Sequence, residues 1–209
     1  MKDTLLSYSG GLDSTSALYV NKDRIAMAVS FNYGSNHNEQ EIKMAKYNCD
    51  KLGIAHKVID AREVFKDMTS SLLGDGDIPH GHYEDETMKS TVVPFRNGIM
   101  LSILTGIAES NELNCVMLAS HKGDNAVYPD CRPEFNKAQA DAMKFGTYNQ
   151  VALVAPFEQL DKKELAQEGI KAGMDPDFTY SCYEGGEVQC GECSTCRERD
   201  WALGLRDEA

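Results

Sequence analysis

A pair of adjacent glycines near the start of the chain constrains the fold more than any other feature of the sequence. The apolar run before them, which includes Leu5 and Leu6, is typical of a buried strand, and a helical segment follows. A strand, a glycine-rich turn and a helix N-terminus bring free backbone N–H groups and the positive end of the helix dipole to one point. Because Gly10 and Gly11 have no Cβ atom, an oxyanion can approach the main chain closely. The stretch therefore predicts an anion-binding site.

The hydroxyl groups around this turn support the same interpretation. Ser9, Ser14 and Thr15 supply further donors, and either Asp13 or Ser14 is expected to cap the helix. No Gly-Lys-Ser/Thr sequence follows, so the turn is not a Walker loop, and adjacent glycines do not match the dinucleotide fingerprint. The alternative is a tight strand-to-helix turn that binds nothing.

Strand-like and helix-like segments alternate along the rest of the chain. Further strands are predicted at residues 25–31, 56–59, 115–119 and 151–154, and helices are predicted to begin near residues 37–39, 96–97, 133 and 161. We expect Gly53 to end the first of these helices, and Asp161 and Glu164 to form a capping box at the last. The alternation predicts an α/β fold, a parallel sheet with helices on both faces. Right-handed crossovers would bring the loop at 120–132 to the same sheet edge as the first loop.

Length, charge and hydropathy narrow the class of protein. The 209 residues suit one sizeable α/β domain, predicted at 1–175, with a small C-terminal segment at 176–209. No apolar run approaches the ~18 residues that a membrane span needs, and the N-terminus leads straight into the first strand. We therefore expect a cytoplasmic protein that does not bind membranes. The net charge of −12 argues against a large nucleic-acid surface.

Four of the seven cysteines lie close together in the C-terminal segment. Cys182, Cys190, Cys193 and Cys196 are separated by seven, two and two residues. In a cytosolic chain this clustering indicates a metal site rather than disulfides. Four thiolates suit tetrahedral Zn²⁺, and a closed shell of four cysteines leaves no position for water, so the zinc would be structural. An iron–sulfur cluster is the alternative, because the same ligands could hold one.

Several motifs make the chain similar to one family. Residues 9–14, Ser-Gly-Gly-Leu-Asp-Ser, resemble the pyrophosphate loop of the N-type ATP pyrophosphatases (PP-loop enzymes), which adenylate a substrate and release pyrophosphate. With its other motifs, the chain resembles the 7-cyano-7-deazaguanine synthases of queuosine biosynthesis. Those motifs are Tyr33-Gly34 with His37, Pro94 with Arg96-Asn97, the segment 128–135, and Ser181-Cys182-Tyr183 followed by the remaining cysteines.

The resemblance implies a fold, a reaction and an assembly. The fold would be Rossmann-like, of the adenine nucleotide alpha hydrolase type, with a C-terminal zinc-binding loop and helix. The enzyme would use ATP and Mg²⁺ to adenylate the carboxylate of 7-carboxy-7-deazaguanine, and ammonia would displace AMP to give an amide. A second activation would dehydrate the amide to the nitrile. The family resemblance also suggests a homodimer.

The resemblance assigns roles to residues that match the family's motifs. Those expected to bind ATP are Tyr8, Ser9, Gly10, Gly11, Leu12, Asp13, Ser14, Thr15, Ser16, Arg96 and Asn97. Those expected to bind the substrate are His121, Asp124, Tyr128, Asp130, Arg132 and Glu134. Asp13, Ser14, Arg96 and Asp130 are the predicted catalytic residues. Asp13 would reach Mg²⁺ or its waters, and Arg96 would hold a phosphate or the substrate carboxylate. Asp130 could instead be a turn residue after Pro129, and His121 a plain loop histidine.

Three positions depart from the family pattern. Phe95 stands where a glycine is usual before Arg96-Asn97, the segment 119–124 differs from the commoner form, and the first helix lacks its usual cysteine. Three alternative functions therefore stay open. They are a synthase that stops at 7-amido-7-deazaguanine, a PP-loop tRNA thiolation enzyme, and a non-catalytic nucleotide-binding or scaffold protein.

The stretch from 66 to 95 shows little periodicity. A loop of this length in a compact domain is usually functional or disordered, and we expect it to act as a mobile lid over the ATP side. His80 and His82 within it could suggest a metal site, but solvated histidines are the favoured interpretation, because no third ligand is evident.

Overall fold

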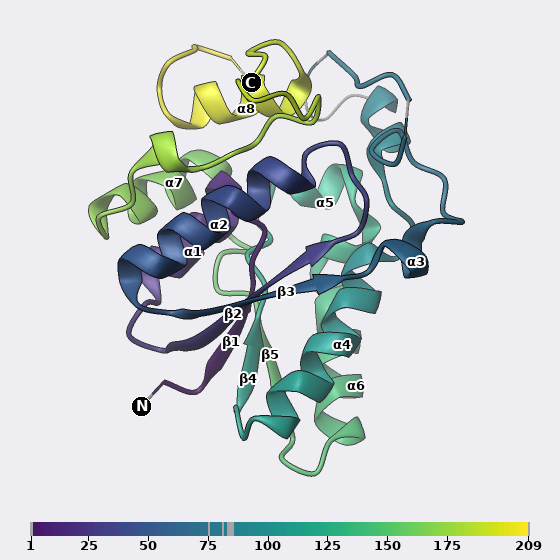
Figure 1. Ribbon diagram of the computed structural model, residues 1–209, viewed down its shortest axis with the longest axis vertical. Coiled ribbons are helices and arrows are strands. Elements are labelled where there is room, and N and C mark those ends of the chain that lie inside the picture. The colour runs from purple at the N-terminus through teal and green to yellow at the C-terminus, as the bar shows by residue number, and fades with distance from the viewer. Residues whose placement is uncertain (1, 75, 81, 83–85, 209) are drawn as a thin grey trace.

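The computed structural model describes residues 2–74, 76–80, 82 and 86–208. Its centre is a sheet of five parallel strands in the order β3-β2-β1-β4-β5 (Figure 1). The strands are β1 (Thr4–Ser7), β2 (Ile25–Asn32), β3 (Ala55–Asp60), β4 (Cys115–Met117) and β5 (Ala152–Val154). The predicted α/β fold with a parallel sheet is confirmed, although β4 ends two residues earlier than the sequence suggests.

Helices cover both faces of this sheet, as the alternating sequence pattern predicts (Figure 1). One layer holds α1 (Leu12–Val20), α2 (Asn38–Leu52) and α7 (Lys162–Lys171), and the other holds α4 (Arg96–Ser110) and α6 (Pro133–Gly146). Successive side chains of a strand point to opposite faces. Leu5 of β1 accordingly packs in the core with Leu101 and Leu104 of α4, whereas Leu6 packs in the core with Ala17 and Leu18 of α1.

Shorter elements complete the chain around the sheet. The short helices are α3 (Arg62–Phe65) and α5 (Asp124–Val127), and α8 (Ser194–Ala202) follows the cysteines. Short 3₁₀ helices occur at Glu86–Thr91, Pro129–Cys131 and Pro176–Phe178. No helix in the described part of the chain combines the length and apolar character needed to span a bilayer.

The strand order fixes where a ligand can bind. From β1 the chain builds outward through β2 and β3 on one side, and β4 returns to pair with the other side of β1. The loops after β1 and β4 therefore diverge to opposite sides and leave a crevice between the carboxyl ends of these two strands. The glycine-rich turn is the loop after β1, so the predicted anion site lies at this crevice.

The caps of the helices only partly follow the sequence-based expectation. The predicted capping box is confirmed, because Asp161 accepts from the Glu164 backbone N–H and the Glu164 side chain accepts from the Asp161 N–H. The predicted cap of α1 is wrong: the helix already begins at Leu12, and its cap residue is Gly11, whose extended backbone starts the helix without a side-chain hydrogen bond. The Ser14 hydroxyl lies within the first turn and turns back to the loop.

The C-terminal segment packs directly on the crevice. The backbone N–H of Tyr180 donates to the Gly10 carbonyl at 3.1 Å. Three of the cysteines, Cys182, Cys193 and Cys196, are buried in the same core as Leu5 and the residues of α4. The segment therefore forms a wall of the crevice, and whether it is a unit separate from residues 1–175 stays a prediction.

The irregular stretch between α3 and α4 carries buried anchors. Leu72 and Met88 are buried, and the Pro79 carbonyl accepts from the Ser194 backbone N–H. The half-exposed His80 forms a hydrogen bond of 2.9 Å with Glu184 beside the cysteines. The acidic residues 84 and 85 of the expected lid lie outside the described residues, and the lid itself stays a prediction.

The backbone leaves almost no room for a side chain at Gly10, in the phosphate loop. Its φ angle is +102°, and an added Cβ atom would overlap the Glu41 carbonyl oxygen and lie 2.9 Å from the Ala45 nitrogen of α2. We expect Gly10→Ala to lower the free energy of unfolding by more than the roughly 1–3 kcal/mol that the backbone conformation alone costs, as measured by urea denaturation. Gly53→Ala is the matched control, because its φ is also positive but no atom lies within 4 Å of the added Cβ. Equal losses in the two variants would contradict the close packing of α2 on the loop.

Candidate active site

One cleft at the carboxyl edge of the sheet brings together residues from almost every part of the chain. Its walls come from the loop after β1, the start of α1, the start of α2, the start of α4, the loop after β4, the start of α7 and the C-terminal segment. The polar residues that line it are Ser7, Tyr8, Ser9, Asp13, Ser14, Tyr33, His37, Asn38, Glu41, Arg96, Asn97, Ser120, Asp124, Tyr128, Lys162, Tyr180, Ser181, Tyr183 and Thr195.

The turn after β1 is held by its own serines. The Ser14 hydroxyl accepts from the backbone N–H groups of Ser9 and Gly10, each at 3.3 Å, and forms a hydrogen bond of 2.9 Å with the Ser9 hydroxyl. The Ser9 oxygen also accepts from the Gly11 N–H at 3.0 Å. The first helical hydrogen bond is that of Thr15 to the Gly11 carbonyl. The amides of residues 12–14 are therefore the orphan donors at the N-terminus of α1, which an anion can accept from.

A buried lysine lies beside this helix N-terminus. Lys162 Nζ lies 3.1 Å from Asp13 Oδ2 and 2.6 Å from Glu198 Oε2, and both Lys162 and Glu198 are almost completely buried. Burial would lower the pKa of Lys162, but the two carboxylates outweigh this effect and raise the pKa above its ordinary value. Lys162 is therefore a fixed positive charge on the wall of the cleft.

The histidine of the loop after β4 has a defined tautomer. His121 is fully buried, and its Nδ1 accepts from the Gly123 backbone N–H at 3.1 Å. Since a neutral imidazole has one donor and one acceptor, the proton lies on Nε2. That nitrogen faces Asp124 Oδ1 at 3.5 Å and Asp13 Oδ2 at 3.8 Å. His121 thus points at the carboxylates beside Lys162 and lies behind the surface of the cleft.

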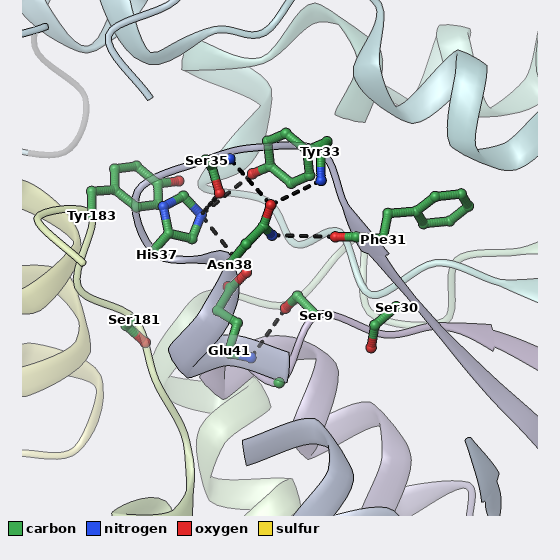
Figure 2. A network of polar contacts seen from close by, with 12 residues as sticks. Ser9, Ser30, Phe31, Tyr33, Ser35, His37, Asn38, Glu41, Ser181 and Tyr183 are labelled. Atoms are coloured by element: carbon green, nitrogen blue, oxygen red, sulfur yellow. Dashed lines mark hydrogen bonds and ion pairs between the residues drawn. The ribbon is translucent and has the colours of Figure 1, made fainter. Parts of the chain in front are cut away.

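The opposite wall is a network of polar side chains at the start of α2 (Figure 2). Asn38 Oδ1 accepts from the backbone N–H groups of Tyr33 and Ser35 at 2.9 and 3.1 Å, and its Nδ2 donates to the Phe31 carbonyl. These bonds hold the turn after β2 against the N-terminus of α2. This turn also positions His37, whose ring stacks on the ring of Tyr183 with 4.9 Å between the ring centres.

Arg96 enters the cleft from the start of α4. Its Nη1 donates to the Tyr33 hydroxyl at 3.0 Å, and the guanidinium lies over the Tyr33 ring. Phe95 precedes it with φ at +53°, the left-handed conformation that favours glycine. This conformation agrees with the expectation from the resemblance that a glycine is usual at position 95. Asp130 Oδ2 accepts from the Asn97 N–H at 2.8 Å and so binds the first turn of α4.

Glu41 is a largely buried carboxylate in the first turn of α2. Its side chain is 12% exposed and contacts His37 Nε2 at 3.7 Å. Burial raises the pKa of Glu41 to about 7, although Arg96 and a hydrogen bond from Ser9 oppose the shift. Burial also lowers the pKa of His37 to about 3, so that this ring is uncharged near neutral pH.

The cleft gathers ten of the residues predicted from sequence. They are Tyr8, Ser9, Gly11, Leu12, Asp13, Ser14, Arg96, Asn97, Asp124 and Tyr128. Seven others do not line it: Gly10, Thr15, Ser16, His121, Asp130, Arg132 and Glu134. Of these, Thr15 and Ser16 are buried within α1, Arg132 Nε donates to the Asn125 carbonyl, and Glu134 is exposed in the first turn of α6. Asp130 acts through its hydrogen bond to the start of α4.

The sequence interpretation missed several cleft residues, two of which had a signal. Lys162 is the first residue of α7, at the positive end of the helix dipole, where a cation is unfavourable unless carboxylates compensate it. Glu41 lies one helical turn before Ala45 on a face of α2 whose buried residues are all uncharged, a position where a carboxylate is unexpected. Ser181 and Tyr183 lie in the motif around Cys182 that carries the resemblance, which assigned them no role. Asn38, Tyr180 and Thr195 show no signal in the sequence, nor does Glu198, which pairs with Lys162 but does not line the cleft.

The four cysteines form a compact cluster in the C-terminal segment, before and at the start of α8. Their sulfur atoms all lie within 4.8 Å of one another, and they are the one metal-binding group found in the part of the chain that the structure describes. Backbone N–H groups of Glu192 and Cys193 point at Cys190 Sγ at 3.4 and 3.3 Å. Tetrahedral zinc with Zn–S of about 2.3 Å places its sulfurs about 3.8 Å apart. The sulfurs of Cys190 and Cys196 lie 3.9 Å apart, so the cluster fits such an ion.

Comparisons with known proteins agree with this geometry. The family model described as "Queuosine biosynthesis protein QueC" matches residues 3–206. The chain is 45% identical over 203 residues to a 7-cyano-7-deazaguanine synthase of Porphyromonas gingivalis, and the match covers 97% of this chain and 92% of that protein. It is 46% identical over 206 residues to a synthase of the same name from Desulfotalea psychrophila, with 97% and 94% covered.

A solved structure supports the fold alone. The NMN synthetase of Francisella tularensis superimposes with a TM-score of 0.53 at 14% identity, over 97% of this chain and 77% of that one. The two proteins therefore share an arrangement of strands and helices, and the likeness says nothing about the ligand of this cleft.

The raised pKa of Glu41 makes stability depend on pH. The folded protein holds the Glu41 proton more tightly than the unfolded chain, so the linked stability is fully present below about pH 4.5 and is lost as the pH rises through about 7. Glu41→Gln removes this loss. We expect the variant to gain stability relative to the wild type between pH 5 and pH 8, by at most about 3 kcal/mol, as measured by urea midpoints. Glu39→Gln, an exposed change on the same helix, should show no such gain, and a constant difference between Glu41→Gln and the wild type would refute the shift.

Proposed function

Because the chain belongs to the queuosine biosynthesis protein QueC family, we propose that it is an ATP-dependent 7-cyano-7-deazaguanine synthase. The observation that carries the proposal is near-full-length similarity to curated synthases of that name. The cleft supports it independently, because a helix N-terminus with orphan amides and a buried lysine suit the phosphates of ATP. The enzyme forms a C–N bond with ammonia as the nitrogen donor and 7-carboxy-7-deazaguanine as the substrate.

The reaction requires two activations by ATP. In the first, a carboxylate oxygen of the substrate attacks the α-phosphorus, pyrophosphate leaves, and an acyl adenylate forms. Ammonia then attacks the acyl carbon, AMP leaves with the bonding pair, and the amide results. In the second, the amide oxygen attacks another ATP, and loss of AMP and protons gives the nitrile. Both activations produce pyrophosphate, so one cradle at the start of α1 serves the two steps.

The start of α1 and Lys162 are proposed to hold the triphosphate. Residues 9–14 supply backbone N–H groups and hydroxyls, and the helix dipole favours negative charge at this point. Lys162 approaches the same point from α7, and its 3.1 Å contact with Asp13 fixes its position. Its charge would compensate the negative charge that develops on the departing pyrophosphate.

Asp13 is the proposed contact to Mg²⁺ or to its waters. Its Oδ2 contacts Lys162, whereas its buried Oδ1 has no hydrogen-bond partner among the described residues. An unpartnered carboxylate oxygen at the phosphate cradle suits a hard cation. The balance of charge also favours a bound cation, because three carboxylates, Asp13, Asp124 and Glu198, surround the single ammonium group of Lys162. The bound Mg²⁺ would supply the positive charge that lets the triphosphate enter beside these carboxylates.

The substrate is proposed to lie against the opposite wall. A flat deazaguanine ring suits the aromatic surface formed by Tyr128, Tyr183 and His37, of which the last two are stacked. Arg96 lies on the same side, next to Tyr33, and its planar guanidinium can donate a pair of hydrogen bonds to the substrate carboxylate. This arrangement would direct the carboxylate toward the phosphate cradle at the start of α1.

The cysteine cluster is proposed to hold a structural Zn²⁺. Its four sulfurs would complete a closed shell, so that the ion would stabilise the C-terminal segment without touching the substrate. The protein is further proposed to act in the cytoplasm as a homodimer, as its family resemblance suggests. Its proposed partners are small molecules, with no role for nucleic acid or a membrane.

Product analysis tests the proposed function. With 7-carboxy-7-deazaguanine, ATP, Mg²⁺ and ammonium, we expect mass spectrometry to detect the nitrile together with AMP and pyrophosphate. Asp13→Asn should abolish pyrophosphate release, because the cradle loses its contact to Lys162 and Mg²⁺. Asp23→Asn, an exposed aspartate in the turn after α1, is the matched control and should keep full activity. If the reaction stops at the amide, the proposed adenylation stands but the proposed dehydration to the nitrile is wrong. If Asp13→Asn is active, the proposed role of Asp13 is wrong.

Elemental analysis tests the metal. We expect about one zinc per chain in the purified protein, and Cys193→Ser should lose this zinc and lower the melting temperature, because Cys193 is both a sulfur ligand and part of the core. Cys49→Ser changes another buried cysteine that is far from the cluster in sequence and packs in the other core, so it should keep its zinc. Iron with sulfide in place of zinc would replace this proposal by an iron–sulfur cluster.

A further inference from the structure

We propose that Glu41 receives the ammonium ion and removes its proton, so that ammonia is released beside the acyl adenylate. The inference rests on the proposed function, since it concerns the nitrogen-addition step of that reaction. It assigns a catalytic role to a residue that none of the sequence motifs singled out. Four observations on the cleft carry it: the position of the carboxylate, its partners, its proton affinity and the use already made of the other carboxylates.

The Glu41 carboxylate lies at the junction of the two walls of the cleft. It extends from the first turn of α2 toward the phosphate loop, beside Ser9 (Figure 2). The position of a Cβ atom on Gly11 would lie 3.5 Å from Glu41 Oε1, so the carboxylate reaches the turn that precedes α1. On its other side it contacts His37, whose ring stacks on Tyr183. A group here faces both the adenylate and the proposed substrate wall.

Few charges compensate the carboxylate. No lysine or arginine in the described ranges forms an ion pair with it. Its contact of 3.7 Å is to His37, which is uncharged near neutral pH because burial lowers its pKa. Arg96 on α4 favours the charged form of Glu41 from a greater distance, and Asp13 on α1 opposes it. Among the described residues, the ionised Glu41 therefore has no ion-pair partner from a lysine or arginine, and a small cation that enters the cleft can bind to it.

The proton affinity of the group suits the transfer. With a pKa of about 7, set mainly by burial, Glu41 is present in both protonation states near neutral pH. General acid–base catalysis is most effective when the pKa of the catalytic group lies near the working pH. Asp13 and Glu198 contact Lys162, and Asp124 contacts the ring of His121. Glu41 is thus the carboxylate of the cleft that stands apart from the lysine cluster.

The step balances in atoms and charge. An ammonium ion binds to the ionised Glu41 and passes one proton to it, which leaves ammonia with a free electron pair. Ammonia attacks the acyl carbon of the adenylate and forms the C–N bond. The C–O bond to the phosphate breaks, AMP leaves with the bonding pair, and the second proton of the nitrogen goes to the AMP phosphate. Glu41 then returns its proton to water, and the amide remains in the cleft.

Three assays of the Glu41→Gln variant test the proposal: one measures adenylation alone, and two measure the reaction with different nitrogen nucleophiles. The first assay is isotope exchange between pyrophosphate and ATP with 7-carboxy-7-deazaguanine and without ammonia, which reports adenylation alone. The second is amide formation from ammonium at pH 8. The third replaces ammonium by hydroxylamine, a nucleophile that is uncharged at this pH and needs no proton removed before it attacks. Glu39→Gln is the matched control, because Glu39 is exposed two residues earlier on the same helix.

We expect Glu41→Gln to retain exchange and the reaction with hydroxylamine but to lose about a hundredfold or more in kcat/KM for ammonium. Glu41→Asp should recover part of the loss. In the wild type, kcat/KM for total ammonium should rise as the pH passes through about 7, where Glu41 ionises, and then level off. In Glu41→Gln it should only follow the growing fraction of free ammonia, with no change of slope near pH 7. Thermal melting of each variant is the control for unfolding: a melting temperature well above the assay temperature shows that a loss of activity does not come from unfolding.

Other outcomes overturn the inference in distinct ways. If Glu41→Gln uses ammonium as well as the wild type does, Glu41 is not the proton acceptor. If it loses ammonium and hydroxylamine equally, or loses exchange, the side chain serves adenylation or the shape of the cleft instead. If the wild type itself shows no exchange with 7-carboxy-7-deazaguanine, the proposed function fails, and this result does not depend on Glu41.

Discussion

The contact of one buried ammonium group with two carboxylates joins the distant parts of this structure. Lys162 comes from α7, Asp13 from α1 and Glu198 from α8, so a single charge connects the phosphate loop with the segment that follows the cysteines. Breaking a buried ion pair by removing one partner costs about 3–5 kcal/mol, because the remaining charge stays buried without compensation. The cluster therefore fixes the relative positions of three helices as well as the charge at the start of α1.

This connection gives the C-terminal segment a place in the site rather than beside it. Glu198 follows Cys196 by two residues on α8, and Tyr180 precedes Cys182 by two residues and donates to the Gly10 carbonyl. A metal held by the cysteines would thus restrain both flanks of a segment that touches the phosphate loop. The argument explains how a closed metal site, which offers no position to a substrate, can still govern the geometry of a catalytic cleft. Its influence would pass through Glu198 to Lys162.

The sequence predicts the elements well but the contacts between elements poorly. The glycine pair, the apolar runs and the periodic helices predict the strands, their parallel direction and the edge where the ligand binds, because these follow from local geometry and the handedness of crossovers. The order of the strands comes from the structure alone. The predicted cap of α1 is wrong because the partners of the two candidate residues cannot be inferred from the local sequence. Asp13 and Ser14 are ordinary capping residues, but here Asp13 pairs with Lys162 from a distant helix, and Ser14 bonds back to Ser9 and Gly10.

Two of the residues that sequence reasoning missed, Lys162 and Glu41, share one property. Each conflicts with its local setting and is explained by a partner from elsewhere in the chain. Lys162 lies at the unfavourable end of a helix dipole, which Asp13 and Glu198 explain. Glu41 places a carboxylate on a buried, uncharged face of α2, which the nearby phosphate loop explains. Phe95 adopts a glycine conformation and is followed by Arg96 in the cleft. Such local conflicts are expected where function outweighs stability, so a charged residue on a buried face is itself evidence for a site.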